Sequence, residues 1–178
     1  MVDYLKHLPG DLPSRLAPAV TNYDCEAMRQ ARNTCRQYLT GNTNEIDPEE
    51  QQLWWATLDH HTTRPFVMYV ELRSNVGQHE SVMDAPIGYG LVRRLELHHS
   101  IGNGWWVSGG LIPRARGKGY GKKLFGALTH LLNTDGKTAW LDVFNTNEPA
   151  RRTYEALGYQ VYDSVLGPPA VIVMRKPA

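Results

Sequence analysis

Hydrophobic and polar positions recur along this chain with two different periods. A period near 3.6 residues predicts amphipathic helices, and alternation or a short continuous apolar run predicts strands. Helical patterns cover residues 21–39, 47–58, 118–132 and 148–157. Strand patterns cover residues 64–72, 86–97, 104–112, 138–144, 159–166 and 170–176. The predicted order is two helices, a strand meander, and then strands that alternate with helices.

The predicted helices carry further signals at their ends and on their faces. The first is expected to bury one face, formed by Tyr23, Met28, Ala31, Cys35 and Leu39. The second begins at Asp47 as N-cap, with Pro48 at its first position and Glu50 in a capping-box arrangement. Its apolar side is expected to consist of Leu53, Trp54 and Leu58. The third is expected to bury Leu124, Ala127, Leu128, Leu131 and Leu132.

The remaining segments show no such pattern. Residues 1–17 are rich in proline and leucine without a period, which predicts an irregular N-terminal lead-in. Residues 74–85 indicate a polar loop, and residues 98–103 and 167–170 join neighbouring strands. A length of 178 residues suits one compact core, and no repeat or linker divides the chain. We therefore expect a single domain over residues 1–178.

Composition excludes several classes of function. The 19 basic and 18 acidic residues give a net charge of +1, so the overall charge favours binding neither to nucleic acid nor to an anionic membrane. Cys25 and Cys35 lack the spacing of a metal site or a disulfide framework, which favours a reducing compartment. The N-terminus has no apolar run typical of a signal sequence or a membrane span. A soluble cytoplasmic protein is the expectation.

A glycine-rich segment, Arg116–Gly121, stands between a predicted strand and a predicted helix. Glycines let the backbone turn sharply, and successive N–H groups at a helix N-terminus attract an anion such as a phosphate or pyrophosphate. Local positive charge comes from Arg114, Arg116, Lys118, Lys122 and Lys123. A tight turn surrounded by solvated charges is the alternative interpretation.

Two common nucleotide motifs do not fit this segment. A dinucleotide fingerprint that starts at Gly117 requires glycine where Lys122 stands. A P-loop that ends in the DGKT of residues 135–138 requires glycine where Leu131 stands.

Two motifs in this chain instead resemble the GCN5-related N-acetyltransferase (GNAT) family. The segment Arg116-Gly117-Lys118-Gly119-Tyr120-Gly121, preceded by Pro113, is similar to the acetyl-CoA loop of the family. A second family pattern matches through Asn147, Ala150, Tyr154, Gly158 and Tyr159. The two motifs occur in the family's order, separated by a helix and a strand, and the resemblance covers about residues 85–162.

The resemblance implies an α/β (α+β) fold with helices on both faces of a mixed, mostly antiparallel sheet of about seven strands. It implies that strand 104–112 carries a bulge and splays from strand 138–144. It further implies that main-chain N–H groups of residues 117–121 hold the CoA pyrophosphate, and that the strand around Leu111 and Ile112 pairs with the pantetheine amides. The cofactor-binding residues that we predict from it are Leu111, Ile112, Arg116, Gly117, Lys118, Gly119, Tyr120, Gly121, Lys122 and Asn147.

The resemblance also suggests catalytic roles for two residues. Tyr154 occupies the position of a general acid near the CoA sulfur, and an apolar helix contact is its alternative role. Asp142 stands where similar enzymes have a glutamate that accepts the amine proton; because aspartate is shorter, a relay through water is the alternative. Its rivals as base are Glu71, Glu96, His98 and His99. Asn147 is expected to contact CoA, to cap a helix, or both.

No metal site is predicted. The histidine pairs His60/His61 and His98/His99 consist of adjacent residues, which point to opposite faces of a strand, and no further ligand spacing accompanies them.

The acceptor is predicted from weaker signals. The pairs Trp54/Trp55 and Trp105/Trp106 are expected to contribute one side chain each to an acceptor site and one to the core. The acidic residues Asp47, Glu49 and Glu50 either attract a cationic amine or serve the helix N-terminus.

We predict acetyl-CoA-dependent transfer of an acetyl group to a primary amine of a small molecule, by direct attack in a ternary complex. Acetylation of a protein or peptide N-terminus or lysine is the alternative within enzymes. A non-catalytic acyl-CoA-binding module is the alternative outside them, and homodimer formation is left open.

Overall fold

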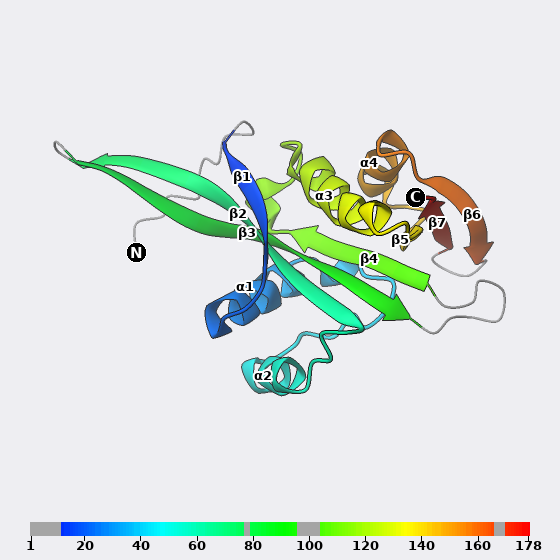
Figure 1. Cartoon of the computed structure of the whole chain (residues 1–178), viewed down its shortest axis with the longest axis horizontal. Helices are drawn as coiled ribbons and strands as arrows, with labels where there is room; N and C mark the ends of the chain where they lie inside the picture. The colour runs from blue at the N-terminus through cyan, green and yellow to red at the C-terminus, as the bar shows by residue number, and fades with distance from the viewer. Residues whose placement is uncertain (1–11, 77–78, 96–103, 166–169) are drawn as a thin grey trace.

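The computed structural model describes residues 12–76, 79–95, 104–165 and 170–178. Seven strands form one sheet in the order β1-β2-β3-β4-β5-β7-β6 (Figure 1). The strands are β1 (Ser14–Pro18), β2 (Thr63–Val76), β3 (His79–Leu95), β4 (Gly104–Leu111), β5 (Ala139–Phe144), β6 (Gln160–Val165) and β7 (Val171–Lys176). The α-helices are α1 (Asn22–Asn33), α2 (Pro48–Ala56), α3 (Tyr120–Thr134) and α4 (Glu148–Ala156), with short 3-10 turns at Arg36–Tyr38 and Pro113–Ala115. This sheet, mixed but mostly antiparallel, confirms the predicted fold class.

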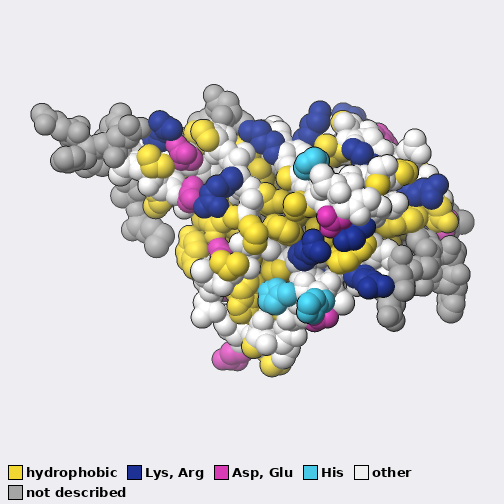
Figure 2. All heavy atoms as spheres, viewed as in Figure 1, with side chains coloured by type: hydrophobic (Ala, Val, Ile, Leu, Met, Phe, Trp, Pro, Cys, Tyr) yellow, Lys and Arg dark blue, Asp and Glu magenta, His cyan; other side chains and the backbone are white. Residues whose placement is uncertain are grey.

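Helices cover both faces of the sheet because its strands carry apolar side chains on both faces. Met68 belongs to the larger hydrophobic cluster, which includes Leu124 of α3 and Tyr154 of α4. The neighbouring Val67 belongs to a second cluster, which includes Met28 of α1. Figure 1 accordingly shows α1 and α2 on one side of the central strands and α3 and α4 on the other. The space-filling view in Figure 2 shows the hydrophobic side chains that remain at the surface interspersed with basic ones.

Strands β4 and β5 separate along their length. They are parallel and pair only at Trp105↔Ala139 and Trp106↔Trp140. The remaining residues of β4, up to Leu111, keep their partners in β3 but have no partner in β5. The predicted splayed pair is therefore confirmed.

The expected bulge in β4 is absent from this ladder. The β3–β4 register runs without a shift from Leu95↔Gly104 to Gly88↔Leu111. A register shift occurs one strand away, between Met68 and Tyr69 of β2, which pair with Gly88 and Pro86. The extra residue is Ile87 of β3, whose side chain is fully buried.

Two segments predicted to be irregular contain strands. Residues 14–17 belong to β1, which pairs antiparallel with β2 at the edge of the sheet. An edge strand tolerates prolines because one side of its backbone makes no ladder hydrogen bonds. Most of the predicted loop 74–85 continues the β2–β3 hairpin, with Ser74 paired to Ser81. Main-chain pairing does not require apolar side chains, so the hydrophobic pattern of the sequence did not predict these strands.

Helix faces also differ from prediction. The first helix ends at Asn33 and a 3-10 turn follows, and Tyr23 is exposed while Asp24 is buried. In α2 the buried residue is Gln51, and Leu53 is 66% exposed. On α3 Leu131 is partly exposed. The joining segment 98–103 and most of 167–170 lie outside the described residues.

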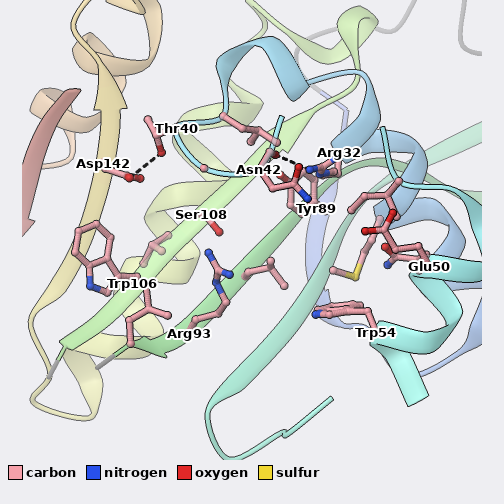
Figure 3. Close-up of a pocket in the computed structure, with 18 residues that line it drawn as sticks. Arg32, Thr40, Asn42, Glu50, Trp54, Tyr89, Arg93, Trp106, Ser108 and Asp142 are labelled. Atoms are coloured by element: carbon pink, nitrogen blue, oxygen red, sulfur yellow. Dashed lines mark hydrogen bonds between the residues drawn. The ribbon is translucent and has the colours of Figure 1, made fainter. Parts of the chain in front are cut away.

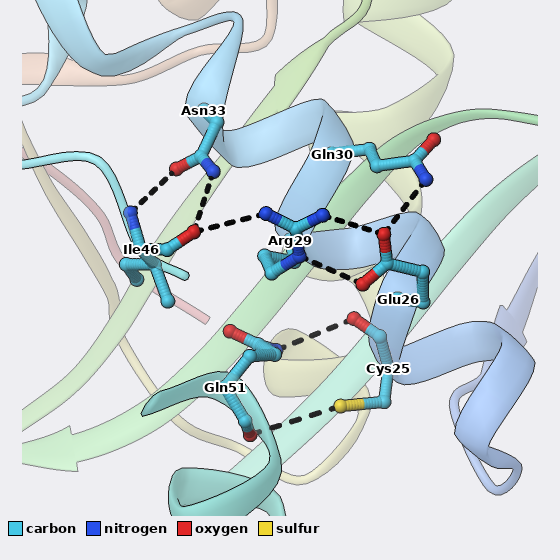
Figure 4. Close-up of polar contacts among 7 residues, drawn as sticks. All are labelled: Cys25, Glu26, Arg29, Gln30, Asn33, Ile46 and Gln51. Atoms are coloured by element: carbon cyan, nitrogen blue, oxygen red, sulfur yellow. Dashed lines mark hydrogen bonds and ion pairs between the residues drawn. The ribbon is translucent and has the colours of Figure 1, made fainter. Parts of the chain in front are cut away.

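Polar contacts explain why α2 buries a glutamine (Figure 4). The side-chain amide of Gln51 donates to the carbonyl of Cys25 in α1, and the Cys25 thiol lies 3.8 Å from the carbonyl of Gln51. Arg29 and Asn33, also on α1, both donate to the carbonyl of Ile46, at 3.0 and 2.8 Å. These contacts fix the segment between α1 and α2 against α1.

Asp24 stabilises the start of α1 and its contact with the sheet. Its carboxylate accepts hydrogen bonds from the N–H groups of Val20 and Thr21, from the Thr21 hydroxyl and from the Tyr69 hydroxyl. Burial alone would raise the pKa of Asp24, but the hydrogen bonds from Tyr69, Val20 and Thr21 outweigh it and the pKa lies below its usual value. The charged carboxylate is therefore the form that stabilises the fold.

We expect Asp24→Ala to lower the free energy of unfolding by roughly 2–4 kcal/mol, because the buried Tyr69 hydroxyl and three partly buried donors of Val20 and Thr21 lose their acceptor. The exposed N-cap variant Asp47→Ala is the control and should cost about 1 kcal/mol. Because the pKa of Asp24 is depressed in the folded state, its stabilisation is present above about pH 4 and is lost as the pH falls through the folded pKa. Urea unfolding at neutral and acid pH measures both effects. Two outcomes would contradict this role of Asp24. One is an equal loss of unfolding free energy in the two variants, and the other is a loss in Asp24→Ala that is as large at acid pH as at neutral pH.

Candidate active site

The separation of β4 and β5 opens a cavity of about 840 Å³, which we call the splay cavity. The open part of β4, the glycine-rich loop, helix α4 and the segment 35–40 contribute to its walls. Its lining residues include Val107, Gly109, Gly117, Gly119, Gly121, Lys122, Asn147 and Tyr154. The two sequence motifs, about 30 residues apart in the chain, therefore face one space.

The glycine-rich loop has the backbone that anion binding requires. Gly117 and Gly119 have φ of 71° and 80°, in the left-handed region that side chains disfavour. Gly119 is the N-cap of α3, so no side chain caps the N-terminus of this helix. The N–H groups in the first turn of a helix have no acceptor within the helix. No atom lies within 4 Å of the Cβ position at either glycine. The two glycines therefore border open space at the start of α3.

Arg116 fixes the position of this loop. Its Nε donates to the carbonyl of Leu111 at 2.9 Å, and its Nη2 donates to the carbonyl of Thr34 at 2.8 Å. Its guanidinium also lies over the ring of Tyr38. Arg116 lines the splay cavity, but its described contacts hold α1, β4 and the loop together.

Four other predicted cofactor residues, Leu111, Ile112, Lys118 and Tyr120, can be placed relative to the splay cavity. The N–H of Ile112 donates to the carbonyl of Ile87, and the carbonyl of Leu111 is occupied by Arg116. Because strand groups alternate in direction, Val107 and Gly109 direct their main-chain groups toward the separated β5. The ring of Tyr120 is fully buried in the core, so only its main chain faces the loop, and Lys118 is not among the residues that line the cavity.

Tyr154 is held deep in the splay cavity by its helix. Asn147 caps α4 by accepting from the N–H of Ala150 at 3.4 Å, which confirms the capping role. The Tyr154 ring packs edge-on against Phe125, with ring centroids 4.8 Å apart. Burial raises the pKa of Tyr154 well above its usual value, and Tyr159 and Asp142 add to the rise. The phenol therefore keeps its proton at neutral pH.

A second cavity of about 500 Å³ lies between the sheet and the α1–α2 segment, and we call it the helix-side cavity (Figure 3). Its walls include Met28, Arg32, Ile46, Glu50, Trp54, Tyr89, Leu91, Arg93 and Trp106. Trp54 and Trp106 line this cavity. Trp105 packs against the larger hydrophobic cluster, and Trp54 and Trp55 both pack against the second one.

The two cavities meet at Asp142 of β5. The residues that line both are Leu39, Thr40, Val107, Ser108 and Asp142. Thr40 donates from its hydroxyl to the Asp142 carboxylate at 2.7 Å, and Figure 3 shows this pair at one end of the helix-side cavity. Asp142 is therefore placed to contact groups in both spaces.

Of the other predicted bases, Glu71 belongs to the described part of the chain, and it is not at this junction. Glu71 forms an ion pair with Arg73 on β2 and lines neither cavity. Glu96, His98 and His99 lie outside the described residues. Asp47 accepts from the N–H of Glu50 at 2.7 Å, which is the helix-capping role.

Sequence reasoning missed Thr40, Ser108, Tyr89 and Arg93. Thr40 lies in an irregular segment, and nothing in its neighbours indicates a partner in β5. Ser108 interrupts the otherwise apolar and glycine pattern of β4, which is a signal that could have been used.

Within the described part of the chain, no group of three or more His, Cys, Asp and Glu side chains is arranged to hold a metal ion. No helix in those same segments is long and apolar enough to cross a membrane.

The sequence matches the family model described as the acetyltransferase (GNAT) family over residues 25–159. No curated protein matches it.

Solved structures share the fold at low sequence identity. An N-acetyltransferase from Staphylococcus aureus Mu50 superposes with a TM-score of 0.72 at 14% identity, covering 93% of this chain and 98% of that one. A phosphinothricin acetyltransferase from Sinorhizobium meliloti in complex with acetyl-CoA has a TM-score of 0.69 at 18% identity, covering 92% and 88%. A spermidine N-acetyltransferase from Vibrio cholerae in complex with CoA and spermine has a TM-score of 0.68 at 18% identity, covering 92% and 95%. At these identities the similarity establishes the fold.

Proposed function

The chain belongs to the acetyltransferase (GNAT) family, and we propose that it transfers the acetyl group of acetyl-CoA to the primary amine of a small molecule. The observation that carries the proposal is the junction of two cavities at Asp142, with a buried, protonated Tyr154 in one of them. A donor in one cavity and an acceptor in the other would bring their reacting groups together without a covalent enzyme intermediate.

The residues of the splay cavity fit acetyl-CoA, which supplies an activated acetyl thioester. Main-chain N–H groups of residues 117–121 would hold the pyrophosphate, with Lys122 adding positive charge. Val107 and Gly109 would pair with the pantetheine amides along the open edge of β4. Asn147 would contribute to the same wall while it caps α4.

Two residues of the chain would move protons in the transfer. Acyl transfer forms a C–N bond and breaks the C–S bond, so the amine loses a proton and the leaving sulfur gains one. Tyr154 would donate its phenolic proton to the sulfur, because it lines the splay cavity in which the thioester would lie. Asp142, directly or through a water, would accept the amine proton, and Thr40 would hold the Asp142 carboxylate in position.

The size of the helix-side cavity favours a small acceptor. Its volume of about 500 Å³ lies in the ordinary range for small-molecule sites, and α1, α2 and the sheet bound it. Aromatic and apolar side chains form much of the wall, with a few charged groups among them. Such a site suits a compact amine better than an extended peptide.

Release of CoA thiol with a panel of amines tests this function. Amino acids, amino sugars, polyamines, aminoglycosides and short peptides with free N-termini should be compared at equal concentration. We expect at least one small amine to be acetylated faster than any peptide. Faster acetylation of a peptide would favour the protein-acceptor alternative, and tight acetyl-CoA binding without any turnover would favour the non-catalytic module.

The dependence of turnover on pH tests the proton transfers. We expect kcat/KM to rise from about pH 6 to about pH 9, because attack requires the neutral amine. No loss from Tyr154 should appear in this range, since its raised pKa keeps the phenol protonated.

Asp142→Asn can still accept the Thr40 hydrogen bond but no longer accepts a proton. It should lower kcat/KM roughly 100-fold near neutral pH, with a smaller loss at alkaline pH where more amine is neutral. A flat profile in the native protein, or full activity of the Asp142→Asn variant, would contradict these roles.

A further inference from the structure

Two hydrogen-bond donors in the helix-side cavity have no acceptor within the part of the chain that the structure describes. Arg93 of β3 and Trp106 of β4 are direct cross-strand partners, so their side chains lie side by side on the same face of the sheet. The Nε of Arg93 and the Nε1 of Trp106 are both buried, and neither has a hydrogen-bond partner among the described residues. Buried donors are normally paired, so an unpaired couple within one cavity indicates a missing acceptor.

The other arginine of the cavity is already occupied. Arg32 donates to the main-chain carbonyls of Asn42 and Asn44 and to the side-chain oxygen of Asn33. Arg93, by contrast, takes part in no salt bridge found among the described side chains. In Figure 3 its guanidinium points toward Ser108, one of the residues that line both cavities. Arg93 is therefore the cation available to a ligand.

From this arrangement, and resting on the proposed function, we infer that the acceptor amine carries a carboxylate, which Arg93 and Trp106 bind in the helix-side cavity. A carboxylate has two acceptor oxygens, which match the guanidinium Nε–H and the indole N–H. Asp142 at the cavity junction would face the amine of the same molecule. The acidic Asp142 and the basic Arg93 would thus match the amine and the carboxylate of an amino acid.

Apolar walls define the rest of the acceptor. Met28, Ile46, Trp54 and Leu91 line the same cavity and provide hydrocarbon and aromatic surface rather than further charge. An amino acid with an apolar or aromatic side chain fits this combination. A polyamine fits less well, because Glu50 is the one further acid among the residues that line this cavity, and the added ammonium groups would share the space with Arg32 and Arg93.

Amino acids compared with their decarboxylated amines provide the test. The pairs are L-phenylalanine with phenethylamine, L-leucine with isoamylamine and L-tryptophan with tryptamine, each bound calorimetrically to the CoA-loaded protein. At least one amino acid should bind about tenfold or more tightly than its amine, and Arg93→Met and Trp106→Phe should remove that preference. Arg94→Met is the matched control, since Arg94 is the adjacent, exposed residue on the opposite face, and it should keep the preference.

Equal binding within every pair, or no binding of any amino acid, would overturn the inference. Loss of binding to both members of a pair in Arg93→Met would also overturn it, provided that the variant retains its melting temperature and its acetyl-CoA affinity. The native comparison needs no variant and so does not depend on folding. Amino-acid preference in binding without any thiol release would support the carboxylate site and contradict the proposed function, so the two failures are distinguishable.

Discussion

Tyr154→Phe is expected to lower the single-turnover rate of acetyl transfer roughly 100-fold or more, while acetyl-CoA affinity stays unchanged. The substitution removes only the phenolic hydroxyl, and the ring keeps its edge contact with Phe125. Without a proton donor, the thiolate must leave unprotonated, which raises the barrier. A single-turnover measurement is preferred because product release can limit kcat and conceal the loss.

Tyr159→Phe is the matched control for this substitution. Tyr159 is a second buried tyrosine close to Tyr154, but its hydroxyl lies 2.7 Å from the hydroxyl of Thr129 in the core. Its loss should reduce stability by about 1 kcal/mol and leave the transfer rate nearly unchanged. Full activity of Tyr154→Phe, or an equal loss in both variants, would remove Tyr154 from the chemistry.

Substitution of the loop glycines should weaken acetyl-CoA binding at least tenfold, which corresponds to about 1.4 kcal/mol. Gly119→Ala places a methyl group where the main chain faces the splay cavity, at a φ of 80°. Gly121→Val adds bulk at a position without positive φ, where the nearest atom to a new Cβ is Leu111 Cδ1 at 3.9 Å. The second variant therefore obstructs the ligand with little backbone strain. Calorimetry with acetyl-CoA measures both.

Gly136→Ala separates strain from ligand contact. Gly136 has a φ of 68° and open space around its Cβ position, as Gly119 has, but it follows the C-terminal end of α3. Gly136→Ala should lower the free energy of unfolding by about as much as Gly119→Ala does, but it should bind acetyl-CoA with the affinity of the native protein. Unchanged affinity in Gly119→Ala and Gly121→Val would exclude the proposed phosphate site.

Features of the site that depend on local sequence were predictable. Left-handed backbone at Gly117 and Gly119 requires glycine, and the cap of α4 requires a short polar residue such as Asn147, so both leave a mark in the sequence. The separation of β4 from β5 was predicted from the resemblance to the GNAT family, and the structure confirms it.

Features that depend on pairing across the sheet were not predictable. Thr40 and Asp142 meet although 102 residues separate them, and no periodicity relates a loop to a distant strand. Arg93 and Trp106 become neighbours only through the β3–β4 register, which a single bulge in β3 at Ile87 leaves intact. Strand β1 and the polar residues of β2 and β3 that pair from Ser74↔Ser81 to Val76↔His79 are held by main-chain pairing, which side-chain patterns do not indicate.

The most direct test of the account measures two products in one reaction: free CoA thiol and the mass of the amine acceptor. With the purified protein and acetyl-CoA, thiol release should require an amine, and each thiol released should correspond to one acetylated amine. Tyr154→Phe should slow both products equally. Thiol release that continues at the same rate without any amine, or acetyl-CoA binding with no acetylated product from any acceptor, would contradict acetyl transfer at the junction of the two cavities.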